Sequence, residues 1–198
     1  MTKDEQYQRY LDLLLKWSKS MDLTAIIDPD EIRSKHFDDS RAPIPFLENA
    51  KTLIDIGTGA GFPGVPIKIE LPRLRVVLLD SKRKKINFCR QAIFELNLEG
   101  IEAYQGRAED PEFFRTHGPF DIVISRATWP LEVFLELANP YYNHGDRCIA
   151  MKGANWEKEL KKAQPVIKKY KLSLVKTHQY TIGKDEKRCL LIFEKHSP

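Results

Sequence analysis

The sequence predicts an α/β fold in which a mostly parallel sheet ends in an antiparallel hairpin. Short apolar runs alternate with longer amphipathic segments over residues 52–170, the pattern of a parallel sheet covered by helices on both faces. Two further runs, at 172–180 and 188–194, flank a turn at 183–185 and predict the closing hairpin. A chain of 198 residues, 42% of them hydrophobic, suits one globular domain with a full core.

The chain before this alternating pattern predicts a helical segment that packs on the main domain. Apolar residues at helical spacing predict one helix over residues 5–20. A second helix, with Asp28 as its N-cap and Pro29 in its first turn, is expected to run to about Phe37. We therefore divide the chain into a helical N-terminal segment over 1–45 and a main domain over 46–198.

Five short apolar runs predict the parallel strands of the main domain, and the segments between them predict its helices. We expect the strands at 52–56, 74–79, 101–104, 121–125 and 147–151. We expect the helices at 64–71, 82–97, 110–116, 129–139 and 155–170.

Composition favours a cytoplasmic protein. No apolar run approaches the roughly 20 residues that cross a bilayer, and the first ten residues are too polar for a secretory signal. The three cysteines lie far apart and form no CxxC pair, which argues against a zinc site or a disulfide framework and favours a reducing compartment. We expect a monomer that binds neither a metal nor a membrane.

The net charge of +4 is modest, but the basic residues are clustered. One cluster lies within nine residues of sequence. A second cluster lies further along the chain, where glutamates are interspersed among its lysines. Each is either a solvated helix face or a nucleic-acid contact, and the first is the stronger candidate for RNA. The clusters are Lys82, Arg83, Lys84, Lys85 and Arg90, and then Lys158, Lys161, Lys162, Lys168, Lys169 and Lys171.

The strongest chemical signal is the sequence DIGTGAGFPG at residues 55–64. An apolar strand runs directly into Gly57, and glycines let the backbone adopt positive φ and approach a ligand closely. Pro63 lacks an N–H donor and fits near a helix N-terminus, so a helix begins at about this point. Four glycines in eight residues exceed what a structural turn needs, and the stretch therefore predicts a cofactor-binding loop.

Two kinds of cofactor compete for this loop. The dinucleotide fingerprint GxGxxG starts where the strand stops, and counted from Gly57 its third glycine falls on Phe62. S-adenosylmethionine (SAM) has no diphosphate to cradle, and its enzymes typically show an acid followed by alternating glycines, here Asp55-x-Gly57-x-Gly59-x-Gly61. In that interpretation Asp55 faces the ammonium of the methionine part. A parallel sheet that ends in an antiparallel hairpin is also typical of SAM-dependent methyltransferases. We therefore expect the Rossmann-like fold of class I SAM-dependent methyltransferases.

Two further acidic positions fit an adenosine ligand. Asp80 closes the second predicted strand, where an acid accepts hydrogen bonds from ribose hydroxyls. Its alternative role is to cap the following helix, for which Ser81 competes. The loop 106–110, with Glu109 and Asp110, follows the third strand, and an acid there can reach the adenine amino group. A surface turn is the alternative for this loop.

Several segments together resemble the RsmG/GidB family of bacterial methyltransferases, which act on 16S ribosomal RNA and make 7-methylguanosine. The resemblance covers nearly the whole chain, from Trp17 to the hairpin, and Gly-Phe-Pro-Gly within the glycine loop is its specific part. The matching segments are Lys16-Trp17, Leu23-Thr24-Ala25, His36-Phe37, Asp39-Ser40, Gly57 to Pro66, Leu79-Asp80-Ser81, Arg107-Ala108-Glu109, Ser125-Arg126-Ala127 and Lys152-Gly153.

The resemblance also implies roles for residues. The implied cofactor contacts are Gly57, Phe62, Ala108, Glu109 and Arg126, with Asp80 at the ribose. The positions implied to face RNA are Lys84, Lys85, Arg107 and Lys152. Arg126 and Lys152 are expected to orient the substrate, and an ion pair with a carboxylate is the alternative for Arg126. His36 is expected to be structural, and no residue is expected to act as a general base.

The expected reaction is methyl transfer from SAM to N7 of a guanine in a decoding-region loop of 16S rRNA, with S-adenosylhomocysteine as the second product. N7 carries a free lone pair and needs no base. The stretch Ser125-Arg126-Ala127-Thr128 lacks the Asn/Asp-Pro-Pro-aromatic tetrad of many amino-group methyltransferases, which argues against an exocyclic amine. The alternatives are a SAM enzyme acting on a small molecule, a nucleotide-linked oxidoreductase and a non-catalytic RNA-binding protein.

Overall fold

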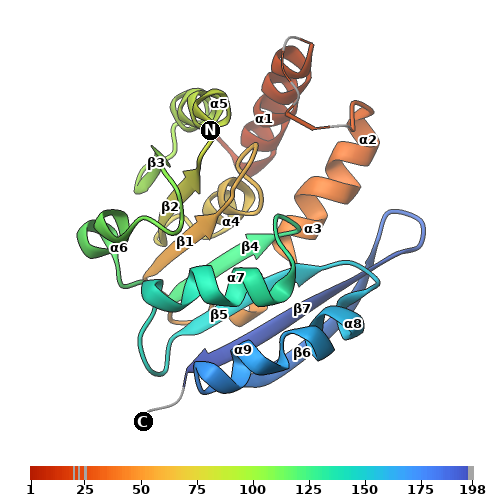
Figure 1. The fold of residues 1–198 in the computed structure, drawn as a ribbon. Coiled ribbons are helices and arrows are strands. Elements are labelled where there is room, and N and C mark those ends of the chain that lie inside the picture. The colour runs from red at the N-terminus through yellow and green to blue at the C-terminus, as the bar shows by residue number, and fades with distance from the viewer. Residues whose placement is uncertain (20, 22, 25, 196–198) are drawn as a thin grey trace.

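The computed structural model describes residues 1–19, 21, 23–24 and 26–195 (Figure 1). These residues form a central sheet, and helices cover both faces of the sheet. Ala25, the last residue of the Leu23-Thr24-Ala25 segment, lies outside the described residues.

Within these residues, seven strands form one sheet in the order β3-β2-β1-β4-β5-β7-β6. They are β1 (Thr52–Ile56), β2 (Arg75–Asp80), β3 (Ile101–Gln105), β4 (Ile122–Arg126), β5 (Arg147–Lys152), β6 (Leu172–Ile182) and β7 (Glu186–Lys195). The first five are parallel, and β7 pairs antiparallel with both β5 and β6. The predicted α/β class, with a hairpin ending the sheet, is confirmed.

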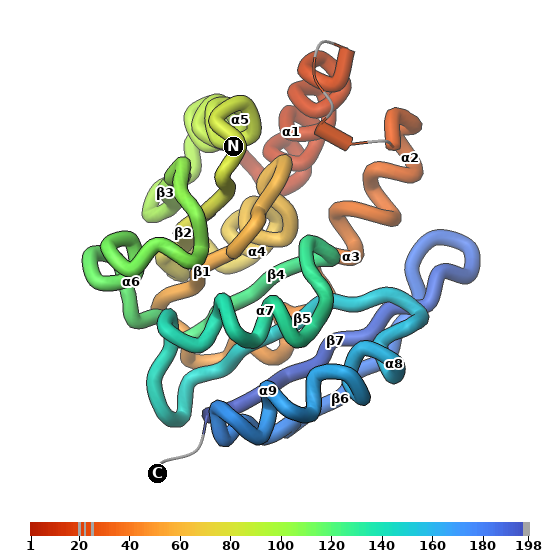
Figure 2. The backbone as a smooth tube through the Cα atoms, viewed as in Figure 1, coloured from red at the N-terminus to blue at the C-terminus, as the bar shows by residue number. Residues whose placement is uncertain are grey.

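The helices lie in two layers, one on each face of the sheet (Figure 2). Buried apolar side chains accordingly form two clusters, one with residues of the helices over 3–18, 64–70 and 83–95 and the other with residues of the helices between 111 and 169. The helices are α1 (Lys3–Ser18), α2 (Pro29–Ile32), the π-helical η1 (Arg33–Asp38), α3 (Asp39–Arg41), the 3₁₀ turn η2 (Ile44–Phe46), α4 (Gly64–Glu70), α5 (Arg83–Glu95), α6 (Pro111–His117), α7 (Leu131–Ala138), the 3₁₀ turn η3 (Asn139–Tyr141), α8 (Trp156–Lys162) and α9 (Gln164–Lys169).

Aromatic side chains join the N-terminal helices to the glycine loop. Tyr10 of α1 is fully buried, and its hydroxyl donates a hydrogen bond to the carbonyl of Ala60. Its ring lies 5.4–6.2 Å, between centroids, from the rings of Phe37, Phe62 and Phe88. The N-terminal segment therefore shares a core with the sheet, while the proposed boundary between the two parts stays a prediction.

Two helices differ from their sequence prediction by more than two residues. The helix expected to end near Phe37 continues through η1 and α3 to Arg41. The single helix expected over 155–170 is wrong, because α8 and α9 are separate helices that meet at Ala163. Pro165 has no N–H to continue the hydrogen-bond ladder of α8, and a new helix starts around it.

Candidate functional site

A cavity of about 450 Å³, here named the first cavity, opens at the carboxyl ends of the parallel strands. The strand order reverses at β1, which has β2 on one side and β4 on the other. Ligands of open α/β sheets bind at such a reversal. The loops after β1 to β4 line this cavity through Ile56, Gly57, Leu79, Asp80, Ser81, Lys82, Lys85, Gly106, Arg107, Ala108, Glu109, Ala127, Thr128 and Trp129.

The glycine loop forms one wall of the first cavity. Gly57, Gly59 and Gly61 have φ angles of 70°, 61° and 91°, where a side chain would be strained. A Cβ on Gly57 would lie 2.7 Å from the indole of Trp129, so only glycine leaves room for that ring. The N–H of Gly57 donates to the carbonyl of Leu79 at 2.7 Å, which holds the loop against β2.

Gly59 and Gly61 do not line the first cavity. The Gly59 N–H donates to Oδ2 of Asp80 at 3.0 Å. A Cβ on Gly61 would lie 2.7 Å from both the Tyr10 hydroxyl and a methyl of Val65. Both glycines thus shape the loop in this structure, and their direct contact with a cofactor stays a prediction.

Asp55 is fully buried beneath the glycine loop and does not line the first cavity. Its Oδ2 accepts hydrogen bonds from the Thr58 hydroxyl at 2.6 Å and the Gly64 N–H at 2.9 Å. Its Oδ1 is buried with no hydrogen-bond partner among the described residues. Burial raises the pKa of Asp55 to about 7, against the opposing effect of the two hydrogen bonds. A positive group near the loop would therefore stabilise the ionised carboxylate.

Asp80 lies at the carboxyl end of β2 and lines the first cavity. Its Oδ2 accepts from the Gly59 N–H, and its Oδ1 accepts from the Lys82 N–H at 2.9 Å. The second bond holds the turn before α5, but the N-cap of α5 is Lys82 and no side chain among the described residues caps the helix, so Asp80 does not act as the N-cap. Each carboxylate oxygen has a second acceptor site that can take a hydrogen bond from a hydroxyl group.

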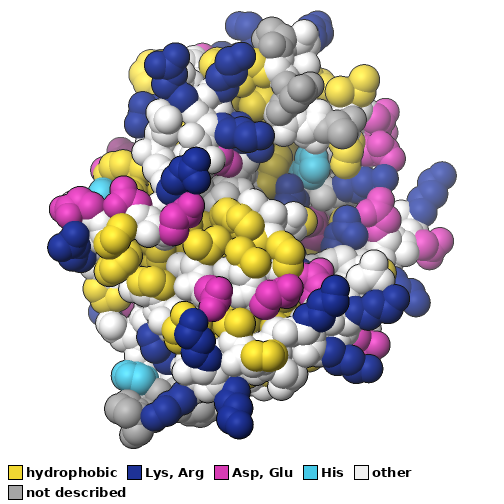
Figure 3. Space-filling view, in the orientation of Figure 1, with side chains coloured by type: hydrophobic (Ala, Val, Ile, Leu, Met, Phe, Trp, Pro, Cys, Tyr) yellow, Lys and Arg dark blue, Asp and Glu magenta, His cyan; other side chains and the backbone are white. Residues whose placement is uncertain are grey.

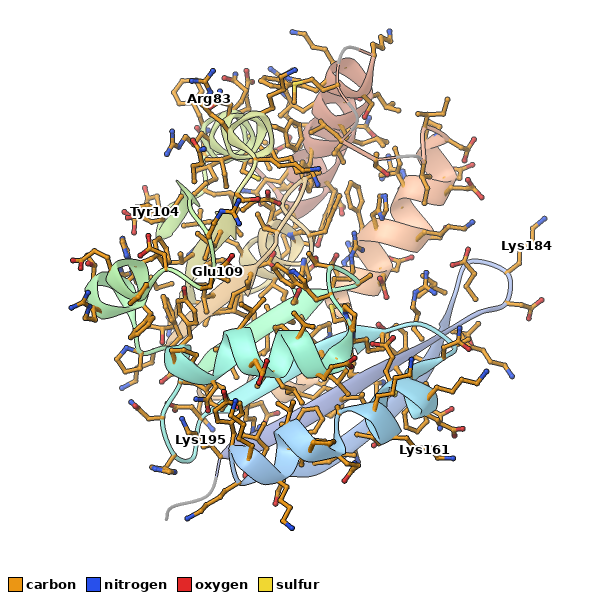
Figure 4. All side chains as sticks on the ribbon, in the orientation of Figure 1. Arg83, Tyr104, Glu109, Lys161, Lys184 and Lys195 are labelled. Carbon is orange, nitrogen blue, oxygen red and sulfur yellow. The ribbon has the colours of Figure 1, made fainter. Side chains whose placement is uncertain are left out.

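The loop after β3 forms another wall of the first cavity, and Figure 4 labels Glu109 there. Ala108 is buried, and its carbonyl accepts from the Tyr141 hydroxyl at 2.9 Å, which fixes the loop. The exposed Glu109 forms an ion pair of 3.3 Å with Arg107. Such an exposed pair contributes about 1 kcal/mol or less, so Glu109 can exchange it for a ligand.

Arg126 and Phe62 do not line the first cavity but face the N-terminal segment. The Arg126 guanidinium stacks on Phe62, 4.8 Å from the ring centroid. One of its nitrogens donates to Asp39 at 3.2 Å, and another lies 3.3 Å from Nδ1 of His36. Arg126 thus forms the ion pair with a carboxylate that the sequence analysis gave as its alternative role. Its contact with a cofactor stays a prediction.

The surroundings of His36 keep it neutral. Burial, followed by the charge of Arg126, lowers the pKa of His36 to about 4. Its Nε2 lies 2.7 Å from the Thr24 hydroxyl, while its Nδ1 faces Arg126. The ring also stacks on Phe62 with centroids 4.8 Å apart. Both ring nitrogens and the ring face thus have partners within the protein, which fits a structural histidine.

A second cavity, of about 320 Å³, adjoins the first, and both include Ala127. It lies at the carboxyl ends of β4 and β5, next to η1 and the start of β7. Charged side chains are frequent in its lining, which comprises Ile26, Lys35, His36, Asp39, Arg126, Ala127, Met151, Lys152, Gly153, Glu186 and Arg188.

Lys152 is buried in the wall of the second cavity, with only 6% of its side chain exposed. Its Nζ lies 2.8 Å from Glu159 and donates to the carbonyl of Trp129 at 2.6 Å. Its charge is therefore neutralised inside the protein. The contact with RNA expected for Lys152 stays a prediction.

The other basic positions predicted to face RNA surround the first cavity. Lys85 and Arg107 line it, and Lys84 is exposed near the start of α5. In Figure 3, Lys and Arg side chains gather over α5 and again over α8 and the hairpin turn. A polyanion laid on this face would meet both groups.

The sequence does not predict Thr128 and Trp129 as site residues, yet both line the first cavity. Trp129 covers Gly57, and the Thr128 hydroxyl donates to the Gly57 carbonyl at 3.2 Å. Their position directly after β4 was the available signal, because such positions at parallel strand ends meet at one edge of the sheet.

No group of three or more His, Cys, Asp or Glu side chains that could hold a metal ion is found within the described residues. Cys89, Cys148 and Cys189 are buried, and none of them forms a disulfide. Among the helices that the structure describes, none is both long and apolar enough to cross a membrane.

The family model of GidB, described as rRNA small subunit methyltransferase G, matches residues 3–190. The chain is similar to proteins named ribosomal RNA small subunit methyltransferase G from Streptococcus suis and Streptococcus pyogenes. Each is 39% identical, over 196 and 197 residues respectively, covering 96% of this chain and 82% of the relative.

Solved methyltransferase structures share the fold. An O-methyltransferase from Bacillus cereus in complex with SAH has a TM-score of 0.67 and 18% identity, over 94% of this chain and 90% of that one. The ribosomal protein L11 methylase from Lactobacillus delbrueckii subsp. bulgaricus has a TM-score of 0.63 and 14% identity, over 82% and 79%.

Proposed function

The chain belongs to the GidB family of small-subunit rRNA methyltransferases, and we propose that it methylates N7 of a guanine in a decoding-region loop of 16S rRNA. SAM is the methyl donor, and S-adenosylhomocysteine is the second product. The observation that carries the proposal is the first cavity, where a glycine loop and the acid that ends the next strand meet at the reversal of strand order.

The residues around the first cavity fit SAM. Asp80 would hold the ribose hydroxyls, and the loop with Ala108 and Glu109 would hold the adenine. Gly57 lines the same cavity, and its backbone would lie against the amino acid part of the donor. Beneath the loop, Asp55 has a buried oxygen without a partner among the described residues, and a nearby ammonium would stabilise its negative charge.

The chemistry requires positioning more than proton transfer. Bound SAM supplies an electrophilic methyl group on a sulfonium. Guanine N7 has a free lone pair at neutral pH, so its attack leaves no proton to remove, and general base catalysis has nothing to act on. The protein then contributes by holding N7 in line with the methyl group and by excluding water. A neutral His36, engaged with Thr24 and Arg126, agrees with this scheme.

The position of N7 limits how RNA can bind. N7 lies on the major-groove edge, which side chains cannot reach in an A-form duplex, so the target base lies in a loop or is turned out of its stack. The exposed Lys84, with Lys85 and Arg107 at the first cavity, would contact phosphates beside that base.

Transfer of label from methyl-labelled SAM tests this function. We expect labelled rRNA from small ribosomal subunits, no labelled product from a small-molecule extract, and thermal stabilisation by S-adenosylhomocysteine but not by NAD. Label confined to small molecules would instead support a small-molecule enzyme. Stabilisation by NAD alone would support an oxidoreductase, and RNA binding without transfer would support a non-catalytic binder.

We also propose that the chain acts as a monomer in the cytoplasm. Among the described residues, the exposed large apolar side chains are scattered over different loops, helices and strands. Examples are Ile27, Phe94, Val133 and Val175. Stable homodimers are usually held by a contiguous apolar patch. Sedimentation is expected to give a species of 23.0 kDa, and a species of twice that mass would contradict the proposal.

A further inference from the structure

The second cavity lies beside the first at the same edge of the sheet. The two share Ala127, the residue after β4. The register pairs Lys152, the last residue of β5, with Cys189 of β7, so Glu186 and Arg188 extend beyond the end of β5. The strand order places β4 and β5 between the glycine loop and these hairpin residues (Figure 1). A ligand in the second cavity therefore lies between the first cavity and the start of β7.

Several polar side chains of the second cavity are engaged with one another and form its walls. Asp39 accepts hydrogen bonds from Tyr180 at 2.7 Å and from Arg126 at 3.2 Å. His36 and Lys152 likewise have polar contacts inside the protein. Their contacts fix the shape of the cavity.

Glu186 is the carboxylate of this cavity that is open to a ligand. Its side chain is 40% exposed, against 4% for Asp39. One oxygen accepts from Lys35 at 2.8 Å and the other from Arg188 at 2.7 Å. A carboxylate oxygen has two acceptor sites, so each keeps one. The hydrogen bond from Lys35 lowers the pKa of Glu186, which is therefore ionised at neutral pH.

Guanine has the chemistry that such a carboxylate recognises. Its Watson–Crick edge presents two adjacent donors, N1–H and the N2 amino group, while N7 lies on the other side of the base. Adenine presents an acceptor at N1, which a carboxylate repels. Proteins that act on a base taken out of its stack recognise it through the Watson–Crick edge, and charge-assisted bonds to a carboxylate are among the strongest available.

We infer that the second cavity receives the guanine to be methylated, and that Glu186 accepts hydrogen bonds from its N1–H and N2 amino group. In this orientation N7 points away from the hairpin, toward Ala127 and the first cavity. Lys35 and Arg188 position the carboxylate from either side. The inference rests on the proposed function and adds the residue that determines base specificity.

Inosine tests this inference, because it keeps N1–H, O6 and N7 but lacks the N2 amino group. Small subunits are reconstituted with guanosine or inosine at the methylated position and compared by kcat/KM. The unaltered protein is expected to prefer guanosine by roughly 10- to 100-fold, the effect of one hydrogen bond to a charged group. Glu186→Ala is expected to lower kcat/KM for guanosine and to remove most of that preference.

The matched control is Asp185→Ala, the preceding residue in the hairpin turn, which lies outside both cavities. It is expected to keep the full preference. Equal methylation of guanosine and inosine by the unaltered protein would overturn the inference without any variant, and so would an unchanged preference in Glu186→Ala. Failure of the proposed function differs, because the unaltered protein would then methylate neither RNA at N7.

Discussion

Lys152 and Glu159 form an ion pair of 2.8 Å that fixes the loop between β4 and α7. Lys152 donates to the carbonyl of Trp129, and Glu159 accepts from the N–H of Leu131 at 2.9 Å. Through Ala127 this loop forms a wall of both cavities. The pair therefore links the packing of α8 to the shape of the site.

Replacing Glu159 by Ala should destabilise the fold, because it leaves the buried charge of Lys152 without its partner. We expect a loss of about 2–3 kcal/mol in the free energy of unfolding, measured by urea denaturation. Glu136→Ala is the control, since its pair with Lys169 is largely exposed and should contribute less than about 1 kcal/mol. Equal losses in the two variants would contradict this role of the pair.

Gly57→Ala should weaken SAM binding strongly, because the new Cβ would collide with Trp129 at a positive φ. Gly145→Ala is matched in backbone strain, with a φ of 86°, but a Cβ there meets nothing within 4 Å. Calorimetry should show unchanged SAM affinity for Gly145→Ala. If Gly57→Ala binds SAM as tightly as the unaltered protein, the cofactor is not at the glycine loop.

SAM affinity should depend on the ionisation of Asp55, whose pKa burial raises to about 7. The cationic donor favours the ionised form, so affinity should rise by up to about eightfold between about pH 6 and 7.5, as the ionised fraction grows. Asp55→Asn should bind more weakly and lose this dependence. At saturating SAM and RNA the single-turnover rate should be nearly flat over the same range. A pH-independent affinity in the unaltered protein would reject the role of Asp55.

Lys84→Ala should reduce the salt dependence of RNA binding. A lysine that contacts a phosphate of single-stranded RNA adds about 0.7 to the log–log salt slope. Lys84 is exposed beside the first cavity but does not line it, so SAM affinity should be unchanged. Lys51→Ala is the control, because Lys51 lies just before β1, at the opposite edge of the sheet. An identical salt slope in both variants would show that Lys84 belongs to a solvated helix face and does not contact RNA.

The sequence predicts the fold where local patterns determine it. Parallel strands covered on both faces appear as apolar runs, and so β1 to β5 begin and end within about one residue of their expected positions. The break at Ala163 escaped prediction because the amphipathic pattern continues across Pro165. The glycine loop and Asp80 lie as expected at strand ends, since parallel strands bring their carboxyl ends to one edge.

The direction of individual side chains could not be predicted, because it depends on which partners, near or distant in the sequence, the folded chain brings to them. Arg126 turns to Asp39, which is 87 positions away in the sequence. Asp55 turns beneath its own loop, where Thr58 and Gly64 bind it. Glu186 reaches the second cavity only because the hairpin extends past β5. None of these contacts follows from composition or spacing.

The identity of the methylated nucleoside is the most direct test of the proposed function. Small ribosomal subunits that lack the modification are incubated with methyl-labelled SAM and this protein, and the rRNA is then digested to nucleosides and separated. We expect the label in 7-methylguanosine of 16S rRNA. Label in an amino-methylated or ribose-methylated nucleoside, or no label in the rRNA, would contradict the proposed reaction.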